Sequence, residues 1–261
     1  MSKKMTQHIT LITFLIMILI NALSIILPIN NIGIDEISKV YDNLFIPAGF
    51  TFSIWGLIYI SLSIYIVFQY KKMTVSNEEI IIAVNKRFSV SSLANSLWIL
   101  CWHYDKILLS LFLMVIILMC LASIILTLNH GNIGKREKLF ITLPFSVYFG
   151  WITIATITNT NALFISIGVD GFSSIAPVIT ILIILIGLVI GFITTYKYKL
   201  MGYGLVVIWA YVGILIRHIS KLGFNVLYPE VIAATVFSIL IMIILETVLL
   251  ISVIKEMNNQ V

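Results

Sequence analysis

Charged residues are scarce in this chain. Of its 261 residues, 16 are Lys or Arg and 11 are Asp or Glu, so only 10% carry a formal charge, against roughly 25% in a typical soluble domain. A surface with so little charge excludes a soluble globular enzyme and an intrinsically disordered chain. Long runs such as Ile179–Ile186, in which Thr180 is the one polar residue, also exclude an outer-membrane barrel, because its strands alternate apolar with polar side chains.

Cysteine and the common catalytic motifs are also missing or rare. The two cysteines, Cys101 and Cys120, lie in apolar runs, where a thiol behaves as a small hydrophobic group, and they cannot form a disulfide scaffold. The sequence contains no CxxC or Cys/His metal spacing and no Walker A, nucleophile-elbow, HExxH or Rossmann glycine pattern. Neither a metal site nor an ATPase, hydrolase or dehydrogenase therefore has support, and we expect no required cofactor.

Apolar residues are abundant instead. They make up 61% of the chain, enough for roughly eight bilayer-spanning helices of about 20 residues each. We therefore predict an all-α polytopic membrane protein, since only helices satisfy the backbone of such runs in lipid. The predicted spans are Ile9–Ile29, Ala48–Phe68, Phe88–Trp102, Leu108–Leu128, Leu139–Thr158, Ile175–Thr195, Gly202–Ile216 and Val231–Val253.

Three of these spans need comment. The third and seventh are short for a full crossing, so we expect the third to extend back through Arg87 or forward through Tyr104, and the seventh through Arg217 and His218. The first follows two lysines, as a signal peptide does, but its apolar run is long for the core of one. We therefore expect it to be retained as a span.

Basic residues predict the orientation. With eight spans and the N-terminus inside, 12 of the 16 Lys and Arg fall in inner segments and 4 in outer ones. By the positive-inside rule, both termini are cytoplasmic in a multi-pass protein of the cell membrane. This distribution also accounts for the net charge of +5 without a nucleic-acid partner.

Aromatic and amide side chains form stripes on three predicted helices. The stripes consist of Trp55 and Tyr59; of Ser92, Asn95, Trp98 and Trp102; and of Tyr148, Trp151, Ala155 and Asn159. Steps of three and four residues place each stripe on one helix face. The stripes could lock helices together through packing and interhelical hydrogen bonds. They could also line a pocket for a flat, apolar ligand.

Three motifs in these stripes resemble a known family. Pro47-Ala48-Gly49-Phe50-Thr51-Phe52-Ser53-Ile54-Trp55-Gly56-Leu57-Ile58-Tyr59 is similar to the loop-to-helix signature of the TspO/MBR family of tryptophan-rich sensory proteins. Asn95-Ser96-Leu97-Trp98 is similar to its Asn-x-x-Trp motif, and the stretch from Trp151 through Ala155 to Asn159 matches its fifth-helix pattern. The motifs lie within residues 5–165, which suggests a five-helix bundle over residues 1–165 and an additional three-helix segment over 166–261.

The resemblance implies a binding function. Family members bind porphyrins and other lipophilic molecules, and some bind sterols, in a cavity under the first loop. Carried over by position, Trp55, Asn95, Trp98, Trp151 and Ala155 would line that cavity, and Pro47, Gly49 and Phe50 would form its lid-side edge. The expected ligand is a tetrapyrrole or another lipophilic small molecule, the expected role is sensing, regulation or transport, and the resemblance also implies a homodimer.

One acidic residue favours an alternative function. Glu246 is the only acid within a predicted span, and an ionisable group inside a membrane is a functional candidate by default. It could serve a secondary transporter coupled to an ion gradient, lie near the inner interface, or pair with a basic loop residue. Breakdown of a bound porphyrin is a third hypothesis, for which the sequence offers no general base or metal.

Overall fold

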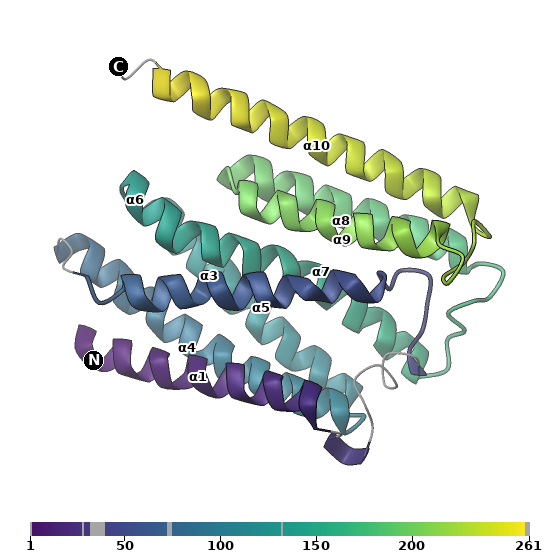
Figure 1. Cartoon of the computed structure of the whole chain (residues 1–261), viewed down its shortest axis with the longest axis horizontal. Helices are drawn as coiled ribbons and strands as arrows, with labels where there is room; N and C mark the ends of the chain where they lie inside the picture. Colours follow the sequence, from purple (N-terminus) through teal and green to yellow (C-terminus); the bar gives the residue numbers. More distant parts are fainter. Residues whose placement is uncertain (1, 28, 32–39, 72–74, 132, 259–261) are drawn as a thin grey trace. The chain divides into compact units, whose positions relative to one another are not determined.

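The computed structural model describes residues 2–27, 29–31, 40–71, 75–131 and 133–258, which contain helices and no strand (Figure 1). The long helices of this described part are α1 (Lys3–Ile26), α3 (Ile54–Phe68), α4 (Val75–His103), α5 (Ile107–His130), α7 (Leu143–Ser166), α8 (Ala176–Tyr198), α9 (Met201–Ile219) and α10 (Pro229–Asn258). Shorter helical pieces are η1 (Ile29–Asn31), η2 (Gly49–Ser53), α6 (Lys135–Glu137) and η3 (Lys138–Thr142). The predicted all-α fold with eight long helices is confirmed.

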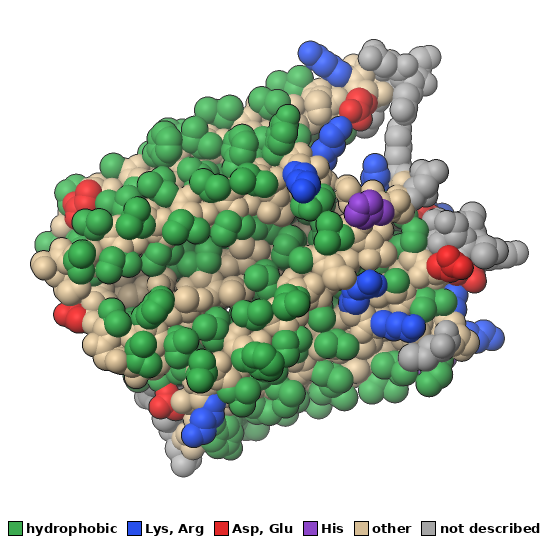
Figure 2. Space-filling model, turned by 180° about the vertical axis from the view of Figure 1, so that it is seen from behind, with side chains coloured by type: hydrophobic (Ala, Val, Ile, Leu, Met, Phe, Trp, Pro, Cys, Tyr) green, Lys and Arg blue, Asp and Glu red, His purple; other side chains and the backbone are tan. Residues whose placement is uncertain are grey.

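Seven of the described helical segments are long and apolar enough to cross a membrane, and α4 is not among them. The reason is its composition: α4 contains Glu78, Glu79, Lys86 and Arg87 together with several serine and asparagine residues. Figure 2 shows hydrophobic side chains over most of one face of the molecule, as expected where lipid tails are the solvent. The chain is a multi-pass membrane protein.

The helix ends refine the predicted spans. Helix α4 extends back beyond Arg87 to Val75, and α9 includes Arg217 and His218, as expected from their short apolar runs. The fifth span begins as a π-helical turn, η3, which ends two residues before Pro144 near the start of α7. Proline has no N–H and its ring crowds the preceding turn, so a widened turn removes the clash without ending the helix.

The chain folds into two compact units that do not follow chain order. The first unit comprises residues 1–42 and 55–169, and the second comprises residues 43–54 and 170–261. The predicted division into residues 1–165 and 166–261 did not anticipate that residues 43–54 would join the later helices. That residues 1–165 and 166–261 are separate domains stays a prediction.

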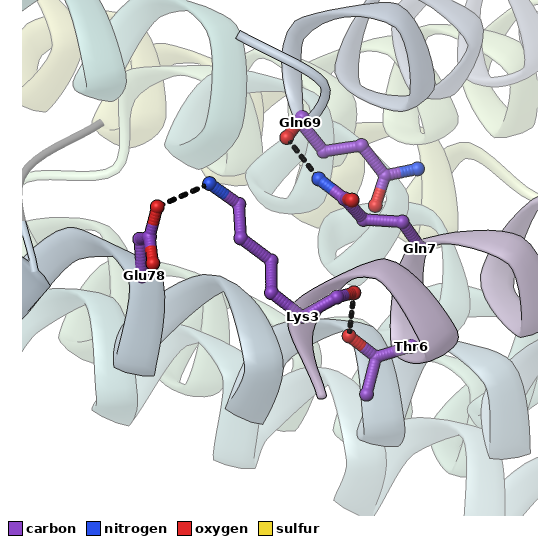
Figure 3. A network of polar contacts seen from close by, with 5 residues as sticks. All are labelled: Lys3, Thr6, Gln7, Gln69 and Glu78. Atoms are coloured by element: carbon purple, nitrogen blue, oxygen red, sulfur yellow. Dashed lines mark hydrogen bonds and ion pairs between the residues drawn. The ribbon is translucent and has the colours of Figure 1, made fainter. Parts of the chain in front are cut away.

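In the first unit, polar side chains connect α1 to α3 and α4. Near the start of α1, Lys3 forms an ion pair with Glu78 of α4 at 2.7 Å, and Gln7 donates to the Gln69 carbonyl just after α3 at 2.5 Å (Figure 3). Further along α1, the Asn21 amide donates to Asn95 Oδ1 at 2.7 Å. These bonds satisfy polar atoms that lipid could not, and they turn the polar face of α4 toward α1.

Aromatic rings fill the interior beside these contacts. Tyr65 of α3 and Phe88 of α4 both pack edge-on against Phe145 of α7, with ring centroids 4.8 and 5.2 Å apart. The Tyr65 hydroxyl donates to Asn85 Oδ1 at 2.5 Å, so this buried ring has a partner for its polar end. Helices α3, α4 and α7 are thereby held together on one side of the aromatic group described below.

In the second unit, α10 packs against α8 and α9, and residues 43–54, here called the strap, lie along α9. The Ala48 N–H donates to the Gly213 carbonyl at 3.0 Å, and Trp209 Nε1 donates to the Thr51 carbonyl at 2.9 Å. Toward the end of α9, Arg217 donates to the Ile46 carbonyl at 3.1 Å. The strap thus uses its backbone groups to bind α9.

Gly213 allows this close approach, which gives a stability prediction. A Cβ atom at residue 213 would lie 2.8 and 2.9 Å from Cγ2 and Cβ of Thr51 and would also overlap its hydroxyl. Because Thr51 is β-branched, rotation about χ1 cannot clear the space. We expect Gly213→Ala to lower the melting temperature of the purified protein in detergent, by an overpacking penalty of about 1–3 kcal/mol.

Gly56→Ala is the matched control. A Cβ atom at residue 56 meets nothing within 4 Å, and alanine favours the helix by about 1 kcal/mol over glycine. We expect this variant to keep or raise the melting temperature. Equal melting temperatures for the two variants would contradict the role assigned to Gly213.

Candidate ligand-binding site

Trp55, near the start of α3, is the centre of an aromatic group in the first unit. Its ring stacks on Tyr59 at 5.6 Å and contacts Trp98 of α4 at 6.3 Å. It also meets Tyr148 and Trp151 of α7 edge-on, at 6.1 and 6.3 Å. The three predicted stripes therefore converge, with one tryptophan in contact with rings from its own helix and from two others.

A polar face of α4 borders this aromatic group. Ser91, Asn95 and Trp98 follow at steps of four and three residues, so they lie on one face of the helix. Ser91 Oγ, Asn95 Nδ2 and Trp98 Nε1 are buried and have no hydrogen-bond partner within the described residues. The Tyr148 hydroxyl lies near Ser91 and Asn95 but forms a well-directed hydrogen bond with neither. Four buried polar atoms beside one aromatic group are more than packing alone explains.

The rings continue from Trp98 toward the end of the helices. Trp98 contacts Trp102 at 6.4 Å, and Trp102 contacts Tyr41 at 5.7 Å. Tyr41 donates a hydrogen bond to Asp105, and burial together with this carboxylate raises the pKa of the Tyr41 phenol above its ordinary value, so the hydroxyl stays protonated. Tyr41 is thereby fixed at one end of a row of rings that leads to Trp55.

A groove of about 1100 Å³ lies at the Tyr41 end of this row. Its lining includes Tyr41 and Asp105, the start of α5 and the end of α7. Leu108 and Phe112 in its wall are 70% and 61% exposed, so in a bilayer they face lipid. Trp55 does not line the groove. The rings of Trp102 and Trp98 connect Tyr41, in the groove, with Trp55.

Asn159 has a structural partner. Its Nδ2 donates to Ser110 Oγ of α5 at 3.0 Å, and both side chains are buried. Asn159 therefore connects α5 to α7, as expected if the stripe residues lock helices together. Asn95 differs, because it accepts one interhelical hydrogen bond while its amide nitrogen has no partner among the described residues. Ala155, one turn before Asn159, is half-buried on α7.

The three predicted lid residues lie in the strap of the second unit. Phe50 packs edge-on against Trp209 of α9 with centroids 5.5 Å apart, Pro47 is buried and Gly49 is exposed. Their assignment to the edge of a ligand cavity stays a prediction. The close partners of the strap in α9 were not foreseen, because the sequence marks no pairing between segments so far apart.

Sequence reasoning missed Ser91 and Tyr41 as residues next to the predicted stripes. Ser92 was placed on the stripe of α4, yet its hydroxyl donates to the Phe88 carbonyl at 2.9 Å, whereas the Ser91 hydroxyl has no partner in the described part of the chain. The spacing of four from Ser91 to Asn95 was the signal that could have identified it. Tyr41 lies in a loop, where helical spacing gives no signal.

These features define the chain as a polytopic helical membrane protein with an aromatic group around Trp55 in its first unit. Its sequence matches the family of TSPO-like proteins over residues 7–249, so the chain belongs to that family. The match includes residues from all eight long helices and extends beyond the stretch of 5–165 that carries the three motifs. Neither a curated protein nor a solved structure matched the chain.

The pairing of Asn159 with Ser110 yields a second stability prediction. Asn159→Ala and Ser110→Ala should each destabilise the protein, and the double variant should lose less than the two losses combined. Interhelical side-chain bonds of this kind have a coupling of about 0.6 kcal/mol, with about 1.7 as an upper value. Unfolding in a denaturant series for the four proteins measures this coupling. Strictly additive losses would contradict the hydrogen bond.

Proposed function

We propose that the aromatic group around Trp55 binds a flat lipophilic molecule, with a porphyrin or another tetrapyrrole as the first candidate, in a sensing, regulatory or transport role. The observation that supports this proposal is the combination of converging rings with four buried polar atoms that make no well-directed hydrogen bond among the described residues. A bound molecule with polar edges would supply those partners. Family membership supports the same class of function.

The chemistry of the site suits a large ring system with polar groups at its edge. Trp55, Trp98 and Trp151 offer flat faces on three helices, and stacking on such faces contributes about 0.5–1.5 kcal/mol per ring pair beyond area burial. Trp98 Nε1 and Asn95 Nδ2 can only donate hydrogen bonds, whereas the hydroxyls of Ser91 and Tyr148 can donate or accept. A carboxylate, carbonyl or ring nitrogen on the ligand would match these donors.

The rings contact one another and fill much of the site themselves. Trp55 has four ring neighbours within 6.3 Å, so a ligand must replace some of these contacts. Rotation of one indole ring could make room, because Trp55 is half-buried rather than enclosed. Exchange of ring–ring for ring–ligand stacking would offset much of the cost of opening.

The groove at Tyr41 supplies a route for a molecule dissolved in lipid. Exposed apolar residues such as Leu108 and Phe112 line part of it, next to the charged residues Asp105 and Lys106. The rings of Tyr41, Trp102 and Trp98 lead from it to Trp55. A lipophilic ligand would therefore enter from the bilayer along the apolar part of this wall. We further propose a cell-membrane location with both termini in the cytoplasm, based on the distribution of Lys and Arg, and a homodimer, based on the family resemblance.

The central position of Trp55 leads to a binding prediction. In a titration of the detergent-solubilised protein with protoporphyrin IX, followed by tryptophan quenching and by porphyrin absorbance, we expect saturable binding. Trp55→Leu should weaken it about tenfold or more, as loss of a buried aromatic hot spot does. Phe237→Leu, which alters an exposed aromatic residue of α10 in the second unit, should leave the porphyrin affinity unchanged. Wild-type affinity in Trp55→Leu would refute the proposed site.

Two adjacent serines test the polar edge of the site. Ser91 Oγ is buried without a partner in the described residues, whereas Ser92 Oγ already donates to the Phe88 carbonyl. Ser91→Ala removes an unsatisfied group, so we expect unchanged or higher stability without ligand, together with porphyrin binding weakened by about 0.5–1.5 kcal/mol, the net value of one hydrogen bond. Ser92→Ala should leave binding unchanged. Equal affinities for the two variants would show that the ligand does not bond to Ser91.

A further inference from the structure

Three helices of the second unit meet at the carboxyl group of Glu246. Glu246 lies on α10, Gly204 on α9 and Thr195 on α8. A Cβ atom at residue 204 would overlap Glu246 Oε1, and the same position is 3.0 Å from Thr195 Oγ1. Gly204 thus leaves the space that the carboxyl group occupies, with the threonine hydroxyl beside it.

The polar atoms at this meeting point are buried and have no partners within the described residues. The Glu246 side chain belongs to a residue that is 7% exposed, and Thr195 is completely buried. Neither carboxyl oxygen of Glu246 nor the Thr195 hydroxyl has a hydrogen-bond partner among the described residues. An acidic group in this position cannot be explained as a member of a salt bridge or of a helix-locking network.

The charged and titratable groups of the neighbouring segments have other contacts. Lys199, which follows α8, pairs with Glu256 of α10 at 3.5 Å, and Lys197 lies over the Tyr198 ring at 5.3 Å. On α9, Tyr203 is buried, and Tyr211 donates its hydroxyl to the Ile184 carbonyl at 2.6 Å. Lys255 follows Glu246 on the same helix, more than two turns further on. None of these cations is in an ion pair with Glu246 within the described part of the unit.

A carboxylate enclosed in this way would be a charge without compensation, which proteins avoid by pairing the charge, by coordinating a metal or by neutralising the group. One carboxyl and one hydroxyl are too few oxygens for a calcium or magnesium site, and the described residues hold no group of three His, Cys, Asp or Glu. A single proton needs only the carboxyl group itself.

We propose that Glu246, Gly204 and Thr195 form a proton-binding site within the membrane-spanning part of the second unit. Glu246 and Thr195 do not bond to each other in the structure, so a rotation of the Glu246 side chain has to bring them together. In the occupied form, the protonated carboxyl then donates its hydrogen to Thr195 Oγ1. When the proton leaves to water, the carboxylate accepts a hydrogen from the same hydroxyl, which rotates to donate it. The Thr195 hydroxyl therefore serves both forms, and no other group has to change its protonation state.

The position of the site allows a proton to exchange with water. Thr195 is about one helical turn before the end of α8, and Gly204 is about one turn after the start of α9. The connection between these helices carries the exposed side chain of Lys199, so water reaches this end of the unit. Acidic residues within membrane-spanning segments are among the groups that proton relays use. The proton site does not depend on the ligand site of the first unit.

Infrared difference spectroscopy of the full chain in liposomes tests this proposal. We expect a carbonyl-stretch band of a protonated carboxyl group at neutral pH, shifted by exchange into D2O and lost at alkaline pH. The band should be absent from Glu246→Gln and retained in Glu256→Gln, the control for an exposed acid on the same helix. Absence of the band from the wild-type protein at neutral pH, or its survival in Glu246→Gln, would overturn the proposal.

Two further measurements distinguish a proton site from a metal-cation site and test its geometry. The wild-type band should be the same in sodium, potassium and choline buffers, and a band that disappears when sodium is added would instead show a metal-cation site and overturn the proposal. Gly204→Ala should shift or abolish the band, because the added methyl group displaces the carboxyl, and should lower the melting temperature less in a Glu246→Ala background. Unchanged band position and equal losses in both backgrounds would contradict the geometry of the site.

Discussion

Polar atoms inside a membrane-spanning bundle have no water to bond with, so each one needs a partner in the protein or in a bound molecule. Several polar side chains of α1 and α4 meet this requirement through one another, as Asn21 and Asn95 do, and others bond to the backbone of their own helix, as Ser92 does. Within the described residues, the exceptions include two groups, one beside the aromatic group of the first unit and one at Glu246 in the second. Both candidate sites are consequences of this one constraint.

The two groups differ in the kind of partner that they require. Beside Trp55, several neutral donors and acceptors lie next to large ring faces, which favours a molecule with area and polar edges. At Glu246, a single acid lies against a glycine and a hydroxyl with no space for an added side chain, which favours the smallest cation. Two different chemistries therefore arise in two units of one chain whose helices have similar apolar compositions.

Much of the fold could be predicted because it depends on local composition. Apolar runs identify the helices, and the helical spacing from Trp55 to Tyr59, repeated on α4 and α7, predicts faces that converge. What the sequence could not specify is pairing across long separations. Nothing near Asn159 indicates Ser110 as its partner, and nothing near Thr51 indicates Trp209. Such pairs depend on how whole helices pack, which a single sequence does not record in any local pattern.

The strap limits where this chain can be cut into parts that fold on their own. Because residues 43–54 pack with helices that follow residue 169, the later helices cannot be regarded as an appendage to a self-sufficient bundle. A chain ending at residue 169 would leave the backbone groups of Ala48 and Thr51 without their α9 partners. The segment that leads into α3 and Trp55 would then lack its hydrogen bonds to α9. The shortest intact form of this membrane protein thus includes α9, and gain or loss of the later helices requires a redesigned first loop.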